Sequence, residues 1–133
     1  MCEIGEGYLK KGSMSQFKAE KEKRQAVRGH KLLPKAARCT LPPIYSQEEK
    51  GLEALARVKF FTPDSSWTWY ASEFDGEDTF FGLVSGFEVE LGYFSFSELE
   101  QIRGPLGLPI ERDRSFLPSS LRELQEREIA RRG

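Results

Sequence analysis

Histidine and cysteine, two side chains that carry much of enzyme chemistry, are scarce in this sequence of 133 residues. Its one histidine is His30, and its two cysteines, Cys2 and Cys39, match neither a CxxC spacing nor a dense disulfide framework. A serine or threonine nucleophile later in the chain would need a neighbouring base, whereas His30 lies in a basic N-terminal segment. The sequence therefore argues against nucleophilic catalysis, and it predicts two free thiols in a reducing cytosol.

Long hydrophobic runs are also lacking. No apolar run approaches the roughly 18 residues of a membrane span, and the stretch MCEIGEGYLKKG has no hydrophobic region of the kind found in signal peptides. We therefore expect a soluble, cytoplasmic protein with no membrane partner. The chain length fits one domain whose core needs no disulfide bond or metal ion.

Lysine does not occur after Lys59. Pro63 and Asp64 invite comparison with metal-dependent nucleases in which such an aspartate precedes a Glu-x-Lys strand, but the lysine of that pattern has no counterpart here. Carboxylates of the kind that bind Mg²⁺ cluster at Glu73, Asp75, Glu77 and Asp78, and again at Glu111 and Asp113. Because the DGED stretch lacks EF-hand spacing, we expect a solvated turn and no cofactor.

Charge is distributed unevenly along the chain. The total is −1, but residues 1–40 carry a net charge of +6, residues 41–118 a net charge of −8, and residues 119–133 a net charge of +1. A basic arm on an acidic body suggests either contact with nucleic acid or attraction between arm and body.

The stretch from residue 58 to residue 94 has the pattern of four short strands. Apolar and charged residues alternate in VKFF and FEVELGYF, whereas WTWYASEF and TFFGLVS are rich in aromatic and β-branched residues on both faces. Asp75-Gly76 predicts a tight type I′ hairpin, and Ser85-Gly86 a second short turn. An antiparallel meander is the simplest arrangement. It should bury Val58, Phe60, Trp69, Leu83, Val89 and Leu91.

The aromatic residues of these strands admit a second interpretation. In sheets that bind single-stranded nucleic acid, exposed rings stack on bases. Such a platform would use Trp67, Trp69, Tyr70, Phe80 and Phe81. The acidic character of this part of the chain favours packing in the core instead.

Two helices follow the strands. Ser95 is predicted to cap the first, with Glu98 as its capping-box partner and Arg103 in the last turn before Gly104. Ser120 and Glu123 offer a second capping box, and the later helix has favourable spacing for ion pairs between Glu123 and Arg127 and between Glu128 and Arg132. The apolar stripe of this helix is narrow, so we expect its end to fray.

The predicted fold class is α+β, with an antiparallel β-meander of about four strands, a capped helix after the last strand, a Pro/Gly loop and a C-terminal helix. We expect a basic arm over residues 1–31, a single core domain over residues 32–118, and the helix over residues 119–133. The loop GPLGLPIERDRSFLP should present Glu111, Arg112 and Asp113 rigidly. The alternative is a network of ion pairs with Arg103 or Arg114. The candidate partner-binding residues are Glu111, Arg112, Asp113, Arg103, Glu77 and Asp78.

Two runs, VKFFTPDSSWTWYASEFDGEDTFFGLV and ELGYFSFSELEQIRGPLGLPIERDRSF, resemble a family of small bacterial proteins of unknown function carried by plasmids, integrative elements and phages. The preceding LPPIYS resembles the entry segment of that family, and the resemblance covers about residues 32–118. It implies mobile-element biology, in which small accessory proteins interfere with host defence or serve DNA transfer. The family has no established activity to assign to single residues.

Three hypotheses about function follow. The first is a non-enzymatic protein-interaction module that binds a basic surface of a partner, as an inhibitor of a host defence or DNA-processing complex. The second is an accessory protein that binds nucleic acid through its arm. It would use Lys18, Lys21, Lys23, Arg24, Arg28, Lys31, Lys35 and Arg38. The third is a Mg²⁺-dependent enzyme that uses the clustered carboxylates.

Overall fold

The computed structural model describes residues 32–132. Most of the arm residues of the nucleic-acid hypothesis therefore lie outside the described part, whereas Lys35 and Arg38 begin and end the short helix α3 (Lys35–Arg38). The chain divides into two compact units, residues 1–40 and residues 41–133. In the first unit, Leu32 and Leu33 are buried. Cys39 is disulfide-bonded, so the prediction of a free thiol at this position is wrong.

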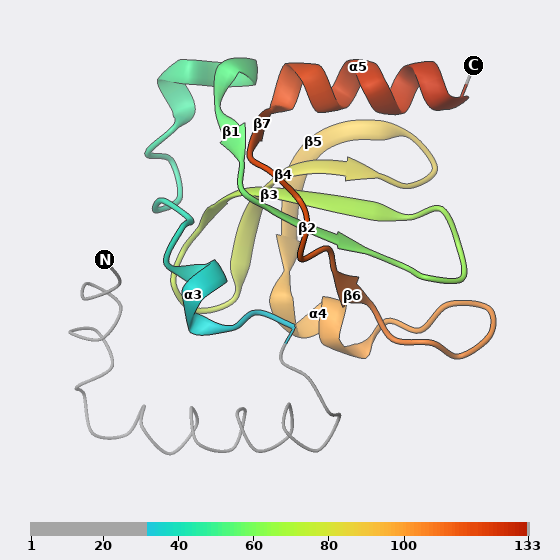
Figure 1. Ribbon diagram of the computed structural model, residues 1–133. Coiled ribbons are helices and arrows are strands. Elements are labelled where there is room, and N and C mark those ends of the chain that lie inside the picture. The colour runs from blue at the N-terminus through green and yellow to red at the C-terminus, as the bar shows by residue number, and fades with distance from the viewer. Residues whose placement is uncertain (1–31, 133) are drawn as a thin grey trace, which may run out of the picture. The chain divides into compact units, whose positions relative to one another are not determined.

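The second unit is built on a five-stranded antiparallel sheet with the strand order β5-β4-β3-β2-β6 (Figure 1). Its strands are β2 (Val58–Phe61), β3 (Thr68–Phe74), β4 (Thr79–Ser85), β5 (Val89–Ser95) and β6 (Glu111–Arg112). The predicted α+β class and the meander from β2 to β5 are confirmed. Strand β6 is the addition: residues expected in a loop pair instead with the outer edge of β2.

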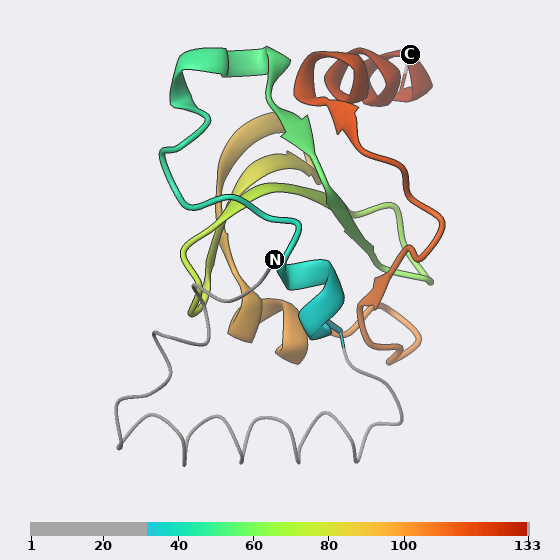
Figure 2. The same cartoon turned by 60° about the vertical axis from the view of Figure 1, so that its left-hand side comes forward.

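A 3₁₀ segment and a helix cover one face of this sheet. The 3₁₀ segment η1 (Glu48–Glu53) and the helix α5 (Leu121–Arg132) lie on the same side of it (Figure 2). A small sheet of β1 (Leu55–Ala56) and β7 (Ser119–Ser120) connects them. Their apolar side chains form a core cluster with Tyr70 and Leu83 of the large sheet. No helix of the described chain is long and apolar enough to cross a membrane.

Aromatic side chains form the core on the opposite face. Phe80 is fully buried at 0% exposure, and its ring centroid lies 4.6 Å from that of Phe74, 5.2 Å from that of Phe94 and 5.5 Å from that of Phe60. Trp69, Tyr70 and Phe80 are buried. These three rings are therefore core residues and cannot stack on bases.

The predicted burial is correct for Val58, Phe60, Trp69 and Leu83. It is wrong for Leu91, which is 39% exposed, and Val89 is only half-buried. β5 is an edge strand, and η1 and α5 leave part of its inward face uncovered. The apolar residues that alternate with polar ones along β5 are therefore not all buried.

The hairpin predicted at Asp75-Gly76 is present, but its loop contains the four residues 75–78 instead of two. The Oδ1 atom of Asp75 accepts hydrogen bonds from the backbone N–H groups of Glu77, Asp78 and Thr79 at 2.8–3.0 Å. Burial alone would raise the pKa of Asp75, but these three bonds hold its pKa below the ordinary value. Gly76 has a φ of 90°, which glycine adopts without strain.

Both predicted capping residues are confirmed, because Ser95 Oγ accepts from Glu98 N–H and Ser120 Oγ from Glu123 N–H. The first helix, α4 (Phe96–Gln101), ends before Arg103, so the prediction of its last turn was too long. In α5, the pair of Glu123 with Arg127 is also confirmed, with an N–O distance of 3.3 Å.

Candidate functional site

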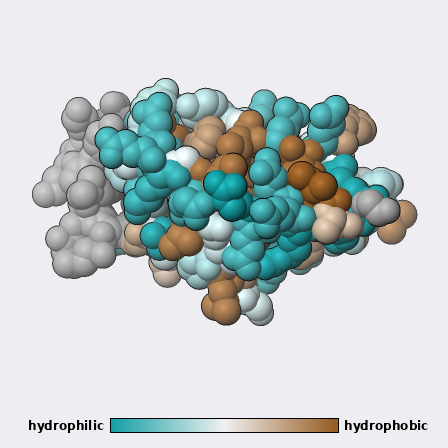
Figure 3. Space-filling model, turned by 90° about the horizontal axis from the view of Figure 1, so that it is seen from above, coloured by the Kyte–Doolittle hydropathy of each residue, from teal (hydrophilic) through white to brown (hydrophobic). Residues whose placement is uncertain are grey.

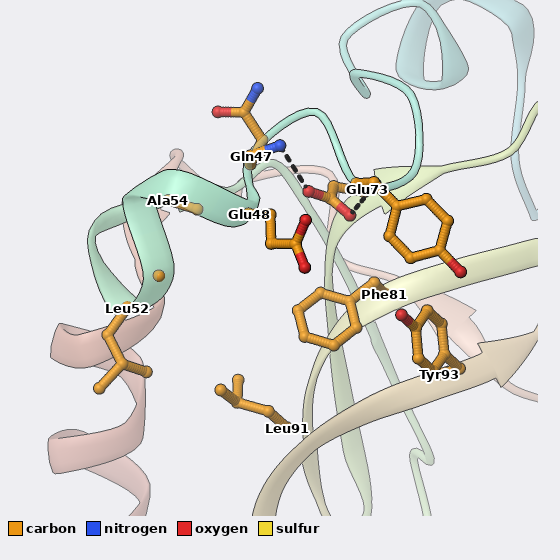
Figure 4. A pocket seen from close by; sticks show the side chains of 10 residues that line it. Gln47, Glu48, Leu52, Ala54, Glu73, Phe81, Leu91 and Tyr93 are labelled. Atoms are coloured by element: carbon orange, nitrogen blue, oxygen red, sulfur yellow. Dashed lines mark hydrogen bonds between the residues drawn. The ribbon is translucent and has the colours of Figure 1, made fainter.

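A pocket of about 310 Å³ opens between η1 and the β4–β5 part of the sheet (Figure 4). It occupies the part of the sheet face that η1 and α5 leave uncovered. Aromatic and aliphatic side chains from β4 and β5 form one side, and the loop before η1 forms the other. The residues that give it its chemical character are Tyr45, Glu48, Glu73, Phe81, Leu91 and Tyr93.

Glu73 is a charged residue built into this pocket. The register of β3 against β4 shifts between Ala71 and Glu73, an irregularity of the kind that re-aims side chains near binding sites. Glu73 is only 4% exposed, and its Oε1 and Oε2 accept the backbone N–H groups of Tyr45 at 2.9 Å and Gln47 at 2.8 Å. The two bonds fix the carboxylate and satisfy part of its hydrogen-bonding demand.

Two tyrosines stand at the open side of the pocket. Tyr45 is 65% exposed and Tyr93 is 56% exposed. The neighbouring Tyr45 hydroxyl raises the pKa of Tyr93, so the Tyr93 phenol is neutral near pH 7. The Tyr93 ring lies 5.0 Å from that of Phe81 between centroids. Tyr45 has a φ of 72°, a strained conformation for a residue other than glycine, and such strain is common at functional sites.

Strand β5 forms the border of the pocket and of the sheet. Within the described residues it pairs with β4 alone, so one edge of seven residues has no neighbouring strand. Glu90, Leu91 and Tyr93 are exposed along it, and so is Glu88, the residue just before the strand. Seen from the side of η1 and α5, hydrophobic side chains gather among hydrophilic ones (Figure 3). An open strand beside an apolar pocket is a surface on which extended peptides bind.

Comparison with known proteins identifies a family. Residues 32–126 match the family described as "Protein of unknown function (DUF2958)". The chain belongs to this family. Neither a curated protein nor a solved structure matches the chain significantly. The family match covers the sheet, the pocket and the first half of α5, so these features belong to the shared domain.

The acidic segment predicted to bind a partner has a different structure from the one expected. Glu111 and Arg112 form β6 at the sheet edge opposite β5. Glu111 is exposed, but Arg112 is largely covered, and burial and the nearby Arg114 lower its pKa. Asp113 forms an ion pair with Lys59 at 3.7 Å, whereas Arg103 and Arg114 were the expected partners. Of the triplet, Glu111 is the side chain best placed to meet a partner.

The other predicted residues serve mainly the local structure. Asp78 accepts hydrogen bonds from the backbone N–H of Ser97 at 2.8 Å and from the Ser95 hydroxyl at 2.5 Å, which ties the β3–β4 loop to the start of α4. Arg103 donates to the carbonyl groups of residues 100 and 102. Glu77 is exposed at the hairpin tip. Glu77 and Asp78 thus lie in the β3–β4 loop, Arg103 follows α4, and Glu111 lies on β6.

The carboxylates that are close together in the sequence make different contacts in the structure. Asp75 and Asp78 hold loop backbone, Glu73 faces the pocket, and Asp64 accepts the N–H of Leu106 at 2.7 Å. In the described part of the chain no group of three histidine, cysteine or acidic side chains is positioned to hold a metal ion.

A buried polar network anchors α5 to the sheet. Glu128 is 4% exposed and accepts hydrogen bonds from the Tyr70 hydroxyl at 2.6 Å, from the Ser85 hydroxyl at 2.8 Å and from Arg131 at 2.5 Å. The predicted pairing of Glu128 with Arg132 is wrong, because Arg132 donates to Ser85 and to two carbonyl groups of the β4–β5 turn. The network positions the helix on the sheet.

Proposed function

We propose that the protein is a non-enzymatic interaction module that binds an extended basic segment of another protein along the open edge of β5. The observation that carries this proposal is the strand itself, which has seven residues, pairs on one side within the described chain and lies beside a pocket. Extended peptides bind such edges through backbone hydrogen bonds, and pockets for alternate side chains supply specificity.

Charge supports a basic partner. Glu88 and Glu90 are exposed just before and within β5, and Glu48 and Glu73 line the pocket. Residues 41–118 carry a net charge of −8. No basic side chain is found among the described residues that line the pocket. Complementary charge accelerates encounter and excludes wrong partners, so this surface favours a lysine- or arginine-rich segment.

The biological setting of the proposal follows from the sequence resemblance. Residues 32–118 resemble small proteins carried by plasmids, integrative elements and phages. An acidic module of this origin fits the role of inhibitor, which would occupy a basic surface of a host defence or DNA-processing complex in place of nucleic acid.

A charge reversal at β5 tests the proposal. The probe is a fluorescent peptide in which lysine alternates with valine, and its binding is measured by fluorescence anisotropy. Changing Glu88→Lys together with Glu90→Lys should weaken binding about tenfold, because two favourable contacts become repulsive. Amide chemical shifts of the unaltered protein should change mainly over residues 89–95 when the peptide is added.

Two controls make this experiment specific. Glu111→Lys together with Glu126→Lys makes the same change in net charge away from β5 and should leave the affinity within about twofold. A peptide of the same composition with alternating L and D residues cannot pair as a strand and should not bind. If the shift changes centre on β6, or if both peptides bind equally, the proposed use of β5 is incorrect.

The basic arm favours a second candidate function, binding of nucleic acid. Residues 1–40 carry a net charge of +6. Changing Lys18, Lys21, Lys23 and Arg24 together to glutamate should abolish gel retardation of DNA at low salt and flatten the dependence of affinity on salt, because fewer counterions are released. Glu20→Lys with Glu22→Lys, in the same segment, should instead tighten binding. If the unaltered chain retards neither DNA nor RNA at low salt, this function is excluded.

A further inference from the structure

The pocket beside β5 combines two kinds of side chain that rarely meet by chance in a concave site. Three aromatic rings, Tyr45, Phe81 and Tyr93, line it, and two carboxylates, Glu48 and Glu73, lie among them. The faces of aromatic rings attract cations, and carboxylates do so more strongly. Sites of this composition bind ammonium and alkylammonium groups in other proteins.

We propose that this pocket binds the cationic end of one lysine or arginine side chain from the segment that pairs with β5. The inference rests on the proposed function and names the contact that would give it specificity. A cavity of about 310 Å³ is at the small end of ligand pockets, which suits one side chain better than a large ligand.

Glu73 supplies the fixed charge for this contact. It is 4% exposed, both of its oxygens accept backbone N–H groups, and within the described chain no lysine or arginine forms an ion pair with it. The two backbone N–H groups bring no formal positive charge to this carboxylate. Because it is shielded from water, its attraction for an entering cation is weakly screened.

Tyr45 connects the rim of the pocket with this charge. Its ring is exposed at the rim, whereas its backbone N–H is bound to Glu73. The positive φ of 72° keeps this residue in a conformation that only the surrounding contacts stabilise. The Tyr45 ring and the Glu73 carboxylate are thus pre-organised. Binding of a cation would therefore cost little free energy for ordering the site.

The test uses small probes and the full-length protein, so that strand pairing is not required. Butylammonium and propylguanidinium represent the two side chains, and butan-1-ol is the neutral analogue of butylammonium. Binding is followed at neutral pH by the amide chemical shifts of residues 45–54, 73, 81, 91 and 93. We expect both cations to bind at least fivefold more tightly than the alcohol and to shift these residues.

A pair of substitutions at an exposed position supplies the matched control. Tyr93→Leu should weaken cation binding about fivefold, whereas Tyr93→Phe, which keeps the ring and removes the hydroxyl, should leave it within about twofold. Because Tyr93 is 56% exposed, both variants should fold, which the unchanged shifts of the aromatic core would verify. Glu73→Gln should also weaken binding, although its second backbone donor loses an acceptor.

The outcomes separate this inference from the proposed function. If the alcohol binds as tightly as the cations, or Tyr93→Leu has no effect, the pocket is not a cation site, and binding of the extended peptide to β5 still stands. If the cations bind but the alternating peptide does not shift residues 89–95, the pocket stands and the strand-pairing function fails. If neither probe binds, the pocket assignment is overturned.

Discussion

Replacing Glu128 with alanine should lower the free energy of unfolding by about 3 kcal/mol, a large loss for one residue of a terminal helix. The carboxylate accepts hydrogen bonds from the buried hydroxyl groups of Tyr70 and Ser85 and from Arg131. Truncation would leave both hydroxyls without their acceptor in the interior, which costs more than the bonds contribute. Urea denaturation followed by tryptophan fluorescence measures the change.

Glu126 on the same helix is the matched control because it is exposed, and Glu126→Ala should change the free energy of unfolding by less than about 0.5 kcal/mol. Equal values for the two variants would mean that the network does not anchor α5. Tyr70→Phe, which removes one donor and leaves the carboxylate in place, should lie between the two.

The pH dependence of stability provides an independent check on Glu128. Burial alone would raise its pKa, but the bonds from Tyr70, Arg131 and Ser85 outweigh burial and hold the pKa below its ordinary value of 4.5. A depressed carboxyl pKa contributes stability above the unfolded pKa, and this contribution is lost as the pH falls through the folded pKa. The unaltered protein should therefore lose more stability than Glu128→Gln does when the pH is lowered from about 5 toward 3.

The parts of the fold that depend on neighbours in sequence could be predicted. The meander from β2 to β5 and the caps at Ser95 and Ser120 depend on alternation and on contacts three residues apart, which a single sequence records. β6 could not be predicted, because Glu111 and Arg112 become a strand only by pairing with Phe60 and Phe61, about fifty residues earlier.

The pocket could not be predicted for a related reason. Leu91 and Tyr93 alternate with polar residues as buried side chains do, and they stay exposed only because η1 and α5 cover the sheet face incompletely. Glu128 is the converse case. Its helical neighbours suggest a solvated face, yet its partners Tyr70 and Ser85 come from two strands far away in the sequence. In both cases long-range packing decides exposure, and no local pattern records it.

The largest effect is expected in the aromatic core, where Phe80→Ala should lower the free energy of unfolding by about 4 kcal/mol. Phe80 is fully buried and contacts four rings, those of Phe60, Phe74, Phe94 and Phe96. Removal of its ring would create a cavity near the start of β4. The surrounding rings come from three strands and a helix, and these elements can close the cavity only partly.

Phe87 is the matched control, since it is 88% exposed in the β4–β5 turn, and Phe87→Ala should change the free energy of unfolding by less than about 1 kcal/mol. Phe80→Leu keeps part of the volume and should fall between the two. Because Phe94 pairs with Phe80 across the sheet and directly precedes the capping residue Ser95, Phe80→Ala should also increase hydrogen exchange in α4. A loss from Phe80→Ala no larger than that from Phe87→Ala would show that the ring cluster does not stabilise the sheet.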